Sequence, residues 1–482
     1  MSIAVTPNLI AGSFVAEAGG EPIEVRDPSD DSVVGRVPAM TAADVDAVIT
    51  AAVDGAKTWR AAGPLARGRI LHDAAALIRA ASADLITLIV SEWGKTTAEA
   101  TGEVGKTAEF FEYYGGMGRA AQGELIPDAR PETFTMIRRE PLGVVLLITP
   151  WNDPLLTPAR KMAPALIAGN AVVIKPATET PLITLRLADI LHRAGLPAGA
   201  LGTVTGRGSQ IGDVLTGDPR FAAVSFTGST TVGLDLQRRL AGSGVRVQTE
   251  MGGKNAAVIL ADADLDLALP VLMAGAFGQA GQRCTATSRL LVERSVADDV
   301  TRRVADAVAA LRVGPGTAEG VDLGPVVSRA QQSDIRARVE AGISEGAELI
   351  ARADVGADLI DGGAFVEPVL LTVDGDNSLW REEVFGPVLG MRIVDSLDEA
   401  IDAVNDSPYG LSSAVFTRSL AAAFRFVDAV DTGQVSVNQP TSGWDIHHPF
   451  GGFKESGSPF KEQGEEALQF YTRVKTAAVR TH

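Results

Sequence analysis

The sequence predicts an α/β protein of two or three domains. Short β-rich runs alternate with longer runs of helical periodicity from about residue 142, which is typical of parallel βαβ units. The same alternation resumes after Gly253. A chain of 482 residues is also too long for one hydrophobic core, since domains usually have about 100–200 residues.

The first series of elements favours a doubly wound sheet, the arrangement that binds nucleotides at the carboxyl ends of its strands. The helix expected at 182–194 stops before Gly195 and Pro197, which are typical helix-ending residues. We expect strands at 144–149, 171–175, 202–205, 222–226 and 245–250, and helices at 155–168 and 182–194.

The second series predicts another α/β domain. Gly252 and Gly253 separate the two series and form a reasonable hinge, because glycine adopts unusual backbone angles at little steric cost. We expect strands at 256–260, 289–293, 386–393 and 412–416, and helices at 265–277, 296–311 and 397–404.

The segments outside these series include helices and an extended excursion. Residues 42–62 and 65–89 have helical periodicity, residues 123–139 are polar and extended, and residues 468–479 are β-rich. An excursion with a terminal strand often forms an arm that pairs with another subunit, and a solvent-exposed hairpin is the alternative.

Composition and charge exclude several partners. The chain has 46% hydrophobic and 21% charged residues, as ordinary globular proteins do, and its net charge of −17 repels nucleic-acid backbones and anionic membranes. The first residues lack the basic start and apolar core of a signal peptide. A single cysteine allows no internal disulfide, so we expect a cytoplasmic protein.

That single cysteine, Cys284, is the first candidate for chemistry. A free thiol has a pKa of about 8.5 and needs an activating neighbour to act as a nucleophile at neutral pH. Taken alone, a lone cysteine is more often a small buried hydrophobe. Its local sequence is Gly281-Gln282-Arg283-Cys284-Thr285.

Two polar residues follow predicted strands at the edge where α/β proteins build their sites. Glu250 ends the strand at 245–250 and can serve as a general base, although a strand-end glutamate often only faces solvent. Asn152 follows the strand at 144–149, and its amide suits a developing oxyanion, although asparagine in a loop is usually turn chemistry.

Other residues suit a dinucleotide. Lys175 closes a strand, and the turn from Gly228 to Gly233 precedes a helix whose first N–H groups favour a pyrophosphate. This turn is not the GxGxxG fingerprint, and residues 206–212 read as a tight turn. The run 382–387 offers a carboxylate and an aromatic ring to a cofactor, or only a solvated face.

Metal binding is not expected. The chain has five histidines, and His447 and His448 would point to opposite sides of a strand.

Taken together, these segments resemble the aldehyde dehydrogenase superfamily over almost the whole chain. The matching runs, in family order, are Pro150-Trp151-Asn152, Lys175-Pro176, Phe226-Thr227-Gly228-Ser229, Glu250-Met251-Gly252-Gly253-Lys254, Gly281-Gln282-Arg283-Cys284, Glu382 to Pro387, and Pro449-Phe450-Gly451-Gly452-Phe453-Lys454.

The resemblance implies a role for each run. Cys284 is then the nucleophile, Asn152 and the Cys284 N–H hold the oxyanion, and Glu250 deprotonates the hydrolytic water. Glu250 also favours release of a free acid over transfer of the acyl group to phosphate or coenzyme A. The implied cofactor is NAD or NADP, with cofactor contacts at Thr149, Pro150, Trp151, Lys175, Thr178, Gly228, Ser229, Glu383 and Phe385.

The sequence departs from the family pattern at several points. Asp153 stands where the family usually has an aromatic or apolar residue, and the run 458–461 replaces a glycine–arginine run. Thr178 stands where enzymes specific for NAD often have a glutamate, while the neighbouring Glu179 can still exclude a 2′-phosphate. Both coenzymes therefore remain open.

The substrate expected from the resemblance is a short carboxylated semialdehyde. Arg160 matches an arginine that pairs with the substrate carboxylate in succinate-semialdehyde dehydrogenases, although a plain helix charge is the alternative. Gly278 stands where those enzymes have a second arginine. The run 281–289 and the chain ending look more like 2-oxoglutarate-semialdehyde dehydrogenases. Asp153 is the second candidate substrate residue.

The resulting prediction is an aldehyde dehydrogenase-like α/β fold with a Rossmann-type cofactor domain, an α/β catalytic domain and a small β oligomerisation arm. The expected boundaries are 1–119 with 141–252 for the cofactor domain, 253–464 for the catalytic domain, and 120–140 with 465–482 for the arm. A homodimer or homotetramer follows from the arm.

Three alternatives stay open. One is a coenzyme A-acylating aldehyde dehydrogenase, the second is a non-catalytic binding protein on the same fold, and the third is a cysteine hydrolase, which would need a histidine partner.

Overall fold

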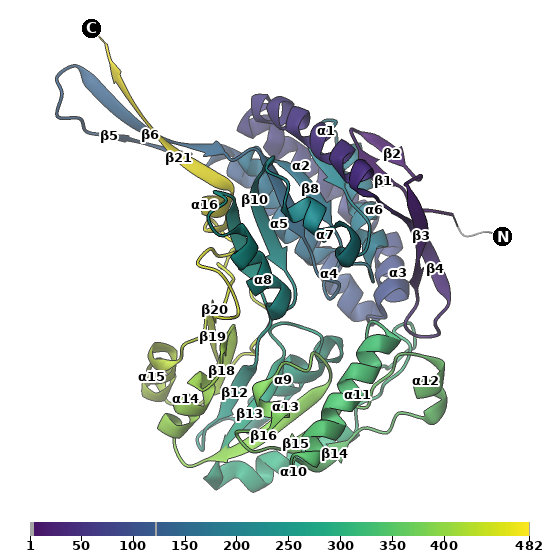
Figure 1. The fold of residues 1–482 in the computed structure, drawn as a ribbon. Coiled ribbons are helices and arrows are strands. Elements are labelled where there is room, and N and C mark those ends of the chain that lie inside the picture. Colours follow the sequence, from purple (N-terminus) through teal and green to yellow (C-terminus); the bar gives the residue numbers. More distant parts are fainter. Residues whose placement is uncertain (1–3, 121–122, 482) are drawn as a thin grey trace.

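The computed structural model describes residues 4–120 and 123–481 and has the predicted α/β architecture. Figure 1 shows two α/β bodies, one built on a five-stranded sheet and the other on a seven-stranded sheet, with a slender β-structure that extends from the first. Both central sheets are mostly parallel.

The five-stranded sheet is entirely parallel, in the order β11-β10-β7-β8-β9. The expected strands and helices are confirmed to within one or two residues. The strands are β7 (Val144–Ile148), β8 (Ala171–Lys175), β9 (Leu201–Thr203), β10 (Phe221–Thr227) and β11 (Arg246–Glu250), connected by α5 (Leu156–Ala168), α6 (Pro181–Arg193), α7 (Gly208–Thr216) and α8 (Thr230–Leu240).

The seven-stranded sheet has the order β14-β15-β16-β13-β12-β18-β19, and only the β14–β15 pair is antiparallel. Its strands are β12 (Asn255–Ile259), β13 (Thr287–Glu293), β14 (Glu348–Arg352), β15 (Val369–Thr372), β16 (Val388–Val394), β18 (Ser412–Phe416) and β19 (Gln434–Val437). Its helices are α9 (Leu265–Phe277), α10 (Ala297–Ala309), α11 (Arg329–Ser344), α12 (Ala357–Gly362), α13 (Ser378–Arg381), α14 (Leu397–Asn405) and α15 (Leu420–Ala429), with short 3₁₀ turns η2 (Gly278–Gly281) and η3 (Arg294–Val296).

The N-terminal segment packs against the five-stranded sheet. Its helix α1 is confirmed, but the single helix expected at 65–89 is wrong, because the chain bends by 72° between α2 and α3. The bend lets both helices place apolar side chains in one cluster, including Leu71 and Ile78 of α2 and Leu85 and Ile89 of α3. The elements are β1 (Asn8–Ile10), β2 (Ser13–Val15), β3 (Gly20–Arg26), β4 (Val33–Ala39), α1 (Ala42–Ala61), α2 (Gly63–Ala80), α3 (Ser82–Trp93), α4 (Thr97–Gly116) and η1 (Met117–Arg119).

No single helix in the described ranges is long and apolar enough to cross a membrane. The α2–α3 pair satisfies the length and composition criteria only when its two bent halves are taken together.

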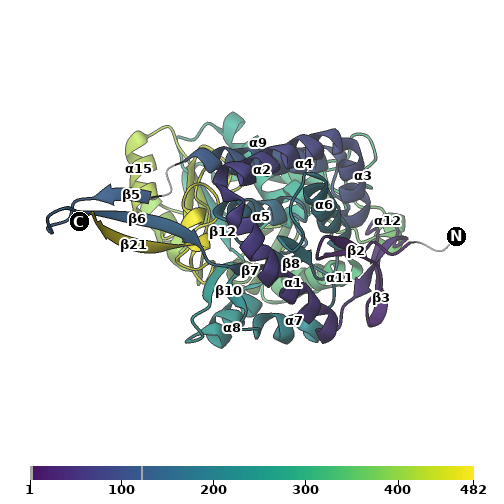
Figure 2. The same cartoon turned by 90° about the horizontal axis from the view of Figure 1, so that it is seen from above.

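The expected extended excursion forms a three-stranded antiparallel sheet in the order β21-β6-β5, which projects from the body in Figures 1 and 2. Its strands are β5 (Gly123–Ile126), β6 (Thr133–Pro141) and β21 (Thr472–Arg480). The expectation that residues 468–471 are also extended is wrong. They belong to the short helix α16 (Ala467–Tyr471), whose residues Phe470 and Tyr471 are buried in the main core.

A small two-stranded sheet pairs β17 (Tyr409–Gly410) with β20 (Phe453–Lys454). It ties the segment around residues 450–457 to the seven-stranded body, while Met251 donates a backbone hydrogen bond to Ser456 from the other side. This segment therefore bridges the ends of the two sheets.

Candidate active site

A cavity of about 510 Å³ lies where the two α/β bodies meet. It gathers most of the residues that the sequence singled out. Pro150, Trp151, Asn152, Asp153, Arg160, Gly228, Ser229, Glu250, Cys284, Glu383 and Phe385 line it, whereas Thr149, Lys175 and Thr178 do not.

Parallel strand ends bring the first group together. β7, β10 and β11 are adjacent in the sheet, so the residues after their carboxyl ends lie at one edge. Thr227 is in register with Glu250, and the Gly228 N–H donates to the Glu250 carbonyl at 3.1 Å. Asn152 follows β7 on the same edge.

The nucleophile candidate lies in a sharply turned loop. Gln279, Ala280 and Gly281 have positive φ angles of 54°, 51° and 68°. A Cβ on Gly281 would lie 2.1 Å from the Gly386 carbonyl oxygen, so only glycine fits this close approach. The Asn255 amide donates to the Cys284 carbonyl at 2.7 Å and fixes the loop beside the cavity.

The Cys284 thiol is half-buried and not disulfide-bonded. Burial raises its pKa to about 12, the nearby charge of Arg160 lowers it, and Glu383, Asp153 and Glu250 raise it. The thiol is therefore protonated in this state of the protein, and a nucleophilic role needs a base or a change in local charge.

Glu250 is 2% exposed, and neither of its carboxylate oxygens accepts a hydrogen bond from a described residue. Burial and the Glu462 carboxylate raise its pKa well above the ordinary value, while Lys161 lowers it. Such a carboxyl group is suited to exchanging a proton near neutral pH. A Cβ on Gly451 would lie 2.6 Å from Glu250 Oε1, so this glycine leaves room for the carboxylate.

A buried ion pair lies behind Glu250. The Lys161 amine pairs with Glu462 and donates to the Ser225 hydroxyl at 2.7 Å. The side chains of Lys161 and Glu462 are 0% and 3% exposed. The charge around Glu250 is therefore set by protein groups rather than by solvent.

The Asn152 side chain makes no hydrogen bond to the described residues and lines the cavity together with Cys284. An unengaged amide donor beside a thiol matches the requirement of an oxyanion site.

The opposite part of the cavity has aromatic and acidic groups. The Trp151 and Phe385 rings meet edge to face with centroids 5.2 Å apart. Glu383 accepts a hydrogen bond from the Gly253 N–H at 2.9 Å, and burial raises its pKa to about 7. A Cβ on Gly252 would lie 2.1 Å from Glu383 Oε2. Close approach of this carboxylate, rather than unusual φ angles, therefore requires glycine at 252.

The remaining cofactor candidates lie at the edge of the five-stranded sheet. Lys175 is buried at the end of β8, where its amine donates to the Pro176 carbonyl at 3.2 Å and burial lowers its pKa. Ser229 is the N-cap of α8, yet its side chain makes no capping bond. The backbone N–H groups at this helix start point to the anion site that the turn predicted.

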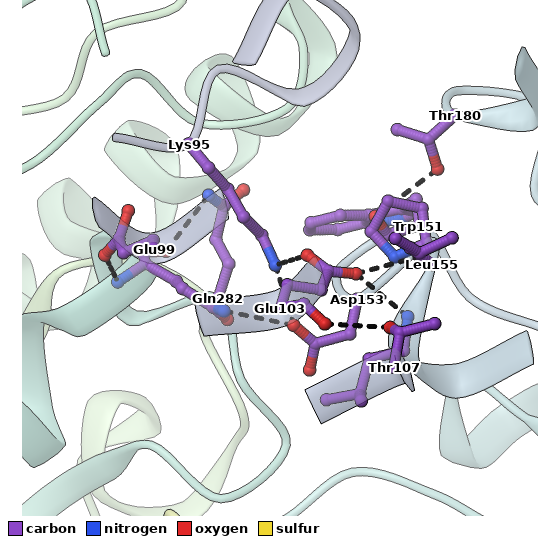
Figure 3. Close-up of polar contacts among 12 residues, drawn as sticks. Lys95, Glu99, Glu103, Thr107, Trp151, Asp153, Leu155, Thr180 and Gln282 are labelled. Carbon is purple, nitrogen blue, oxygen red and sulfur yellow. Dashed lines mark hydrogen bonds and ion pairs between the residues drawn. The ribbon is translucent and has the colours of Figure 1, made fainter. Parts of the chain in front are cut away.

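Asp153, the departure from the family pattern, has a buried partner that the sequence did not reveal. The Lys95 amine lies 2.7 Å from Asp153 Oδ1 and 2.6 Å from Glu103 Oε2, and Figure 3 shows it between the two carboxylates. Gln279 donates to Asp153 Oδ1 at 3.0 Å. Burial raises the pKa of Asp153, but the charges of Lys95 and Arg283 lower it further, to a net value below the ordinary one.

Glu103 connects this network to the helix that carries Arg160. Its Oε1 accepts hydrogen bonds from the Leu155 and Leu156 N–H groups at 2.9 and 3.0 Å, which caps the start of α5. Arg160 itself lies with Nη1 3.9 Å from Glu462 Oε2 and with its guanidinium 5.0 Å from the Phe450 ring centre. It lines the cavity while its charge is partly engaged.

The sequence-based reasoning missed Lys95, Glu103, Lys161, Glu462 and Arg283 as site residues. A signal for Lys161 was present, since a lysine within the apolar run of α5 needs a buried partner. The expectation for His447 and His448 was wrong, because they lie in a turn with ring centres 4.2 Å apart and not in a strand.

The fold and this site define a family. A model of the aldehyde dehydrogenase family matches residues 14–477, and the chain belongs to this family.

Two curated relatives are similar over nearly their full lengths. The 2,5-dioxopentanoate dehydrogenase of Saccharolobus solfataricus is 40% identical over 472 residues, which cover 97% of this chain and 98% of that protein. The alpha-ketoglutaric semialdehyde dehydrogenase of Bacillus subtilis is 36% identical over 480 residues, with 98% of both chains covered. Among solved structures, betaine aldehyde dehydrogenase from Staphylococcus aureus in complex with NAD+ is 32% identical, with a TM-score of 0.96 over 99% of this chain and 96% of that chain.

Proposed function

We propose that this protein is an NAD(P)-dependent dehydrogenase that oxidises a short carboxylated semialdehyde to the corresponding acid. The observation that carries the proposal is the presence of Cys284, Glu250 and Asn152 in one cavity, beside the aromatic pair of Trp151 and Phe385. The two curated relatives named for five-carbon semialdehydes support the substrate class.

The residues fit a dinucleotide. The uncapped start of α8 at Ser229 suits a pyrophosphate, and Lys175 and Glu383 suit ribose hydroxyls. The solved relative with NAD+ supports this assignment. The bound coenzyme supplies a hydride acceptor.

In the acylation step, Cys284 Sγ forms a bond to the aldehyde carbon and the carbonyl π bond breaks. The oxyanion accepts hydrogen bonds from the Asn152 amide and the Cys284 N–H. The thiol proton must leave first, and Glu250 is the buried base beside it that raises the thiol pKa. Loss of hydride from the same carbon then gives a thioester.

In the deacylation step, Glu250 takes a proton from a water that attacks the thioester carbon. The carbon–sulfur bond breaks, the carboxylic acid leaves and the thiol is restored. The Lys161–Glu462 pair sets the charge around Glu250 during this exchange.

Coenzyme choice stays open between NAD and NADP. Thr178 is half-buried and neutral, so it neither repels a 2′-phosphate nor binds both ribose hydroxyls. Glu179 is exposed next to it. We expect both coenzymes to be used.

We further propose the domain division 1–119 with 141–252, 253–464, and 120–140 with 465–482, supported by the separate sheets and cores. Exposed apolar side chains on the projecting sheet, including Leu125 and Val474, support its use as an arm in a homodimer or homotetramer. The single cysteine supports a reducing, cytoplasmic location.

The test follows NAD(P)H absorbance with 2,5-dioxopentanoate and with matched neutral aldehydes. Cys284→Ala should abolish oxidation and keep coenzyme binding, whereas Glu250→Gln should give one burst of NAD(P)H and then stall. Turnover that requires coenzyme A would favour the acylating alternative. Coenzyme binding without turnover on any aldehyde would favour a binding protein.

A further inference from the structure

The cavity has a second guanidinium, that of Arg283, immediately before the nucleophile candidate in the chain. We propose that Arg283 is the specificity-determining residue that binds the carboxylate of the semialdehyde substrate. This inference rests on the proposed function and assigns the group that recognises the acid end of the substrate.

Arg283 is half-buried and makes no ion pair or hydrogen bond through its side chain to the described residues. Its guanidinium lies beside Gly278, and a Cβ on this glycine would be 3.5 Å from Nη1 and 3.9 Å from Nη2. Glycine at this position therefore leaves space next to the guanidinium. An arginine with free donors in a partly buried cavity is suited to bidentate capture of a carboxylate.

The acidic side chains on this side of the cavity already have partners. Asp153 is bound by Lys95 and Gln279, and Glu103 by Lys95 and two backbone N–H groups. Glu99 accepts hydrogen bonds from the Thr96 and Gln279 N–H groups at 3.0 and 2.6 Å. The buried Lys95 thus neutralises the carboxylate that would otherwise compete for Arg283.

Arg160 is less available for the same task. Its guanidinium packs on the Phe450 ring and lies near the Glu462 carboxylate, on the side of the cavity where Glu250 and Lys161 are coupled. Its charge acts on the Cys284 thiol, whose pKa it lowers. We therefore assign Arg160 to the electrostatics of the nucleophile and Arg283 to the substrate carboxylate.

The position of Arg283 also limits the substrate. An aldehyde carbon at Cys284 Sγ and a carboxylate at the adjacent residue's guanidinium are joined by a short chain. The ligand class is therefore a short aliphatic aldehyde with a terminal carboxylate.

The experiment compares 5-oxopentanoate with pentanal, two aldehydes of equal length that differ in the terminal carboxylate. Steady-state kinetics are measured for the wild type, Arg283→Gln, Arg283→Lys and Lys106→Gln. Lys106 is a half-buried lysine that lines the same cavity, so its substitution removes the same charge from another position.

For Arg283→Gln we expect KM for 5-oxopentanoate to rise about 10- to 100-fold, as for loss of a charge-assisted hydrogen-bonded pair, with a much smaller change for pentanal. Arg283→Lys should recover part of the loss, because it keeps the charge but not the bidentate geometry. Lys106→Gln should change the ratio of the two substrates less than Arg283→Gln does.

Equal loss on both aldehydes after Arg283→Gln would overturn the assignment and indicate a structural role. Equal shifts in the Lys106 and Arg283 variants would overturn it in favour of the general field of the cavity. Failure of the wild type to oxidise either aldehyde would instead count against the proposed function.

Discussion

The Lys95 amine lies 2.7 Å from the Asp153 carboxylate, and no part of the Lys95 side chain is exposed. The two residues come from separate segments, one from the turn between α3 and α4 and the other from the loop after β7. Their pairing holds the loop that carries Asn152 against the helical layer, with Glu103 as the second carboxylate. Positioning of the oxyanion donor thus depends on this buried cation.

Replacement of Lys95 by methionine should destabilise the protein strongly. It leaves Asp153 and Glu103 buried without their cation, and such uncompensated charges cost about 3–5 kcal/mol. The measurement is the free energy of unfolding in urea. Lys57→Met is the control, because the Lys57–Asp54 pair is exposed and contributes about 0–1 kcal/mol. Equal effects of the two substitutions would contradict this account.

Lys161 and Glu462 should move the acidic limb of the deacylation rate in opposite directions. Lys161 lowers the pKa of Glu250, so Lys161→Met should raise that pKa and shift the limb to higher pH. Glu462 raises the pKa of Glu250, so Glu462→Gln should shift the limb to lower pH. Single-turnover hydrolysis of the acyl-enzyme over pH gives the limb directly.

Shifts of the same sign in both variants would show that the two side chains act through packing. Glu250→Gln is the reference, because it should remove the limb altogether.

The Cys284 thiol should react slowly with iodoacetamide in the protein without coenzyme. Since burial raises its pKa to about 12, the alkylation rate should rise about tenfold per pH unit between pH 7 and 10 without a plateau. Arg160→Gln should slow alkylation and Glu250→Gln should accelerate it, because these groups lower and raise the thiol pKa respectively. Mass spectrometry of the single cysteine peptide measures the rate. A plateau below pH 9 would refute the burial effect.

Much of the fold was predictable because its signals are local. Alternating β-rich and helical runs identified every strand of the five-stranded sheet, and strand ends located Asn152 and Glu250 at one edge. The break between α2 and α3 was not predictable from periodicity, because Ala81 at the junction is neither glycine nor proline. Tertiary packing of both apolar faces determines that bend.

The charged network around the site was not predictable for a different reason. Lys95 and Asp153 are 58 residues apart, and Lys161 and Glu462 are 301 apart. Each of these side chains resembles an ordinary surface charge until the fold brings it to its partner. Arg283 was visible only as a neighbour of Cys284, since its lack of an acidic partner among the described residues is a property of the assembled cavity.

The coenzyme preference should respond to Thr178. This residue lies three positions after Lys175, at the sheet edge where the ribose is expected, and Glu179 already lowers the positive potential there. Thr178→Glu adds a carboxylate that repels a 2′-phosphate and can accept hydrogen bonds from ribose hydroxyls. We expect kcat/KM for NADP to fall at least about tenfold relative to that for NAD, which corresponds to about 1.4 kcal/mol. Thr178→Val is the matched control, since it removes the hydroxyl without adding charge, and an equal change of the ratio in both variants would exclude electrostatic discrimination at this position.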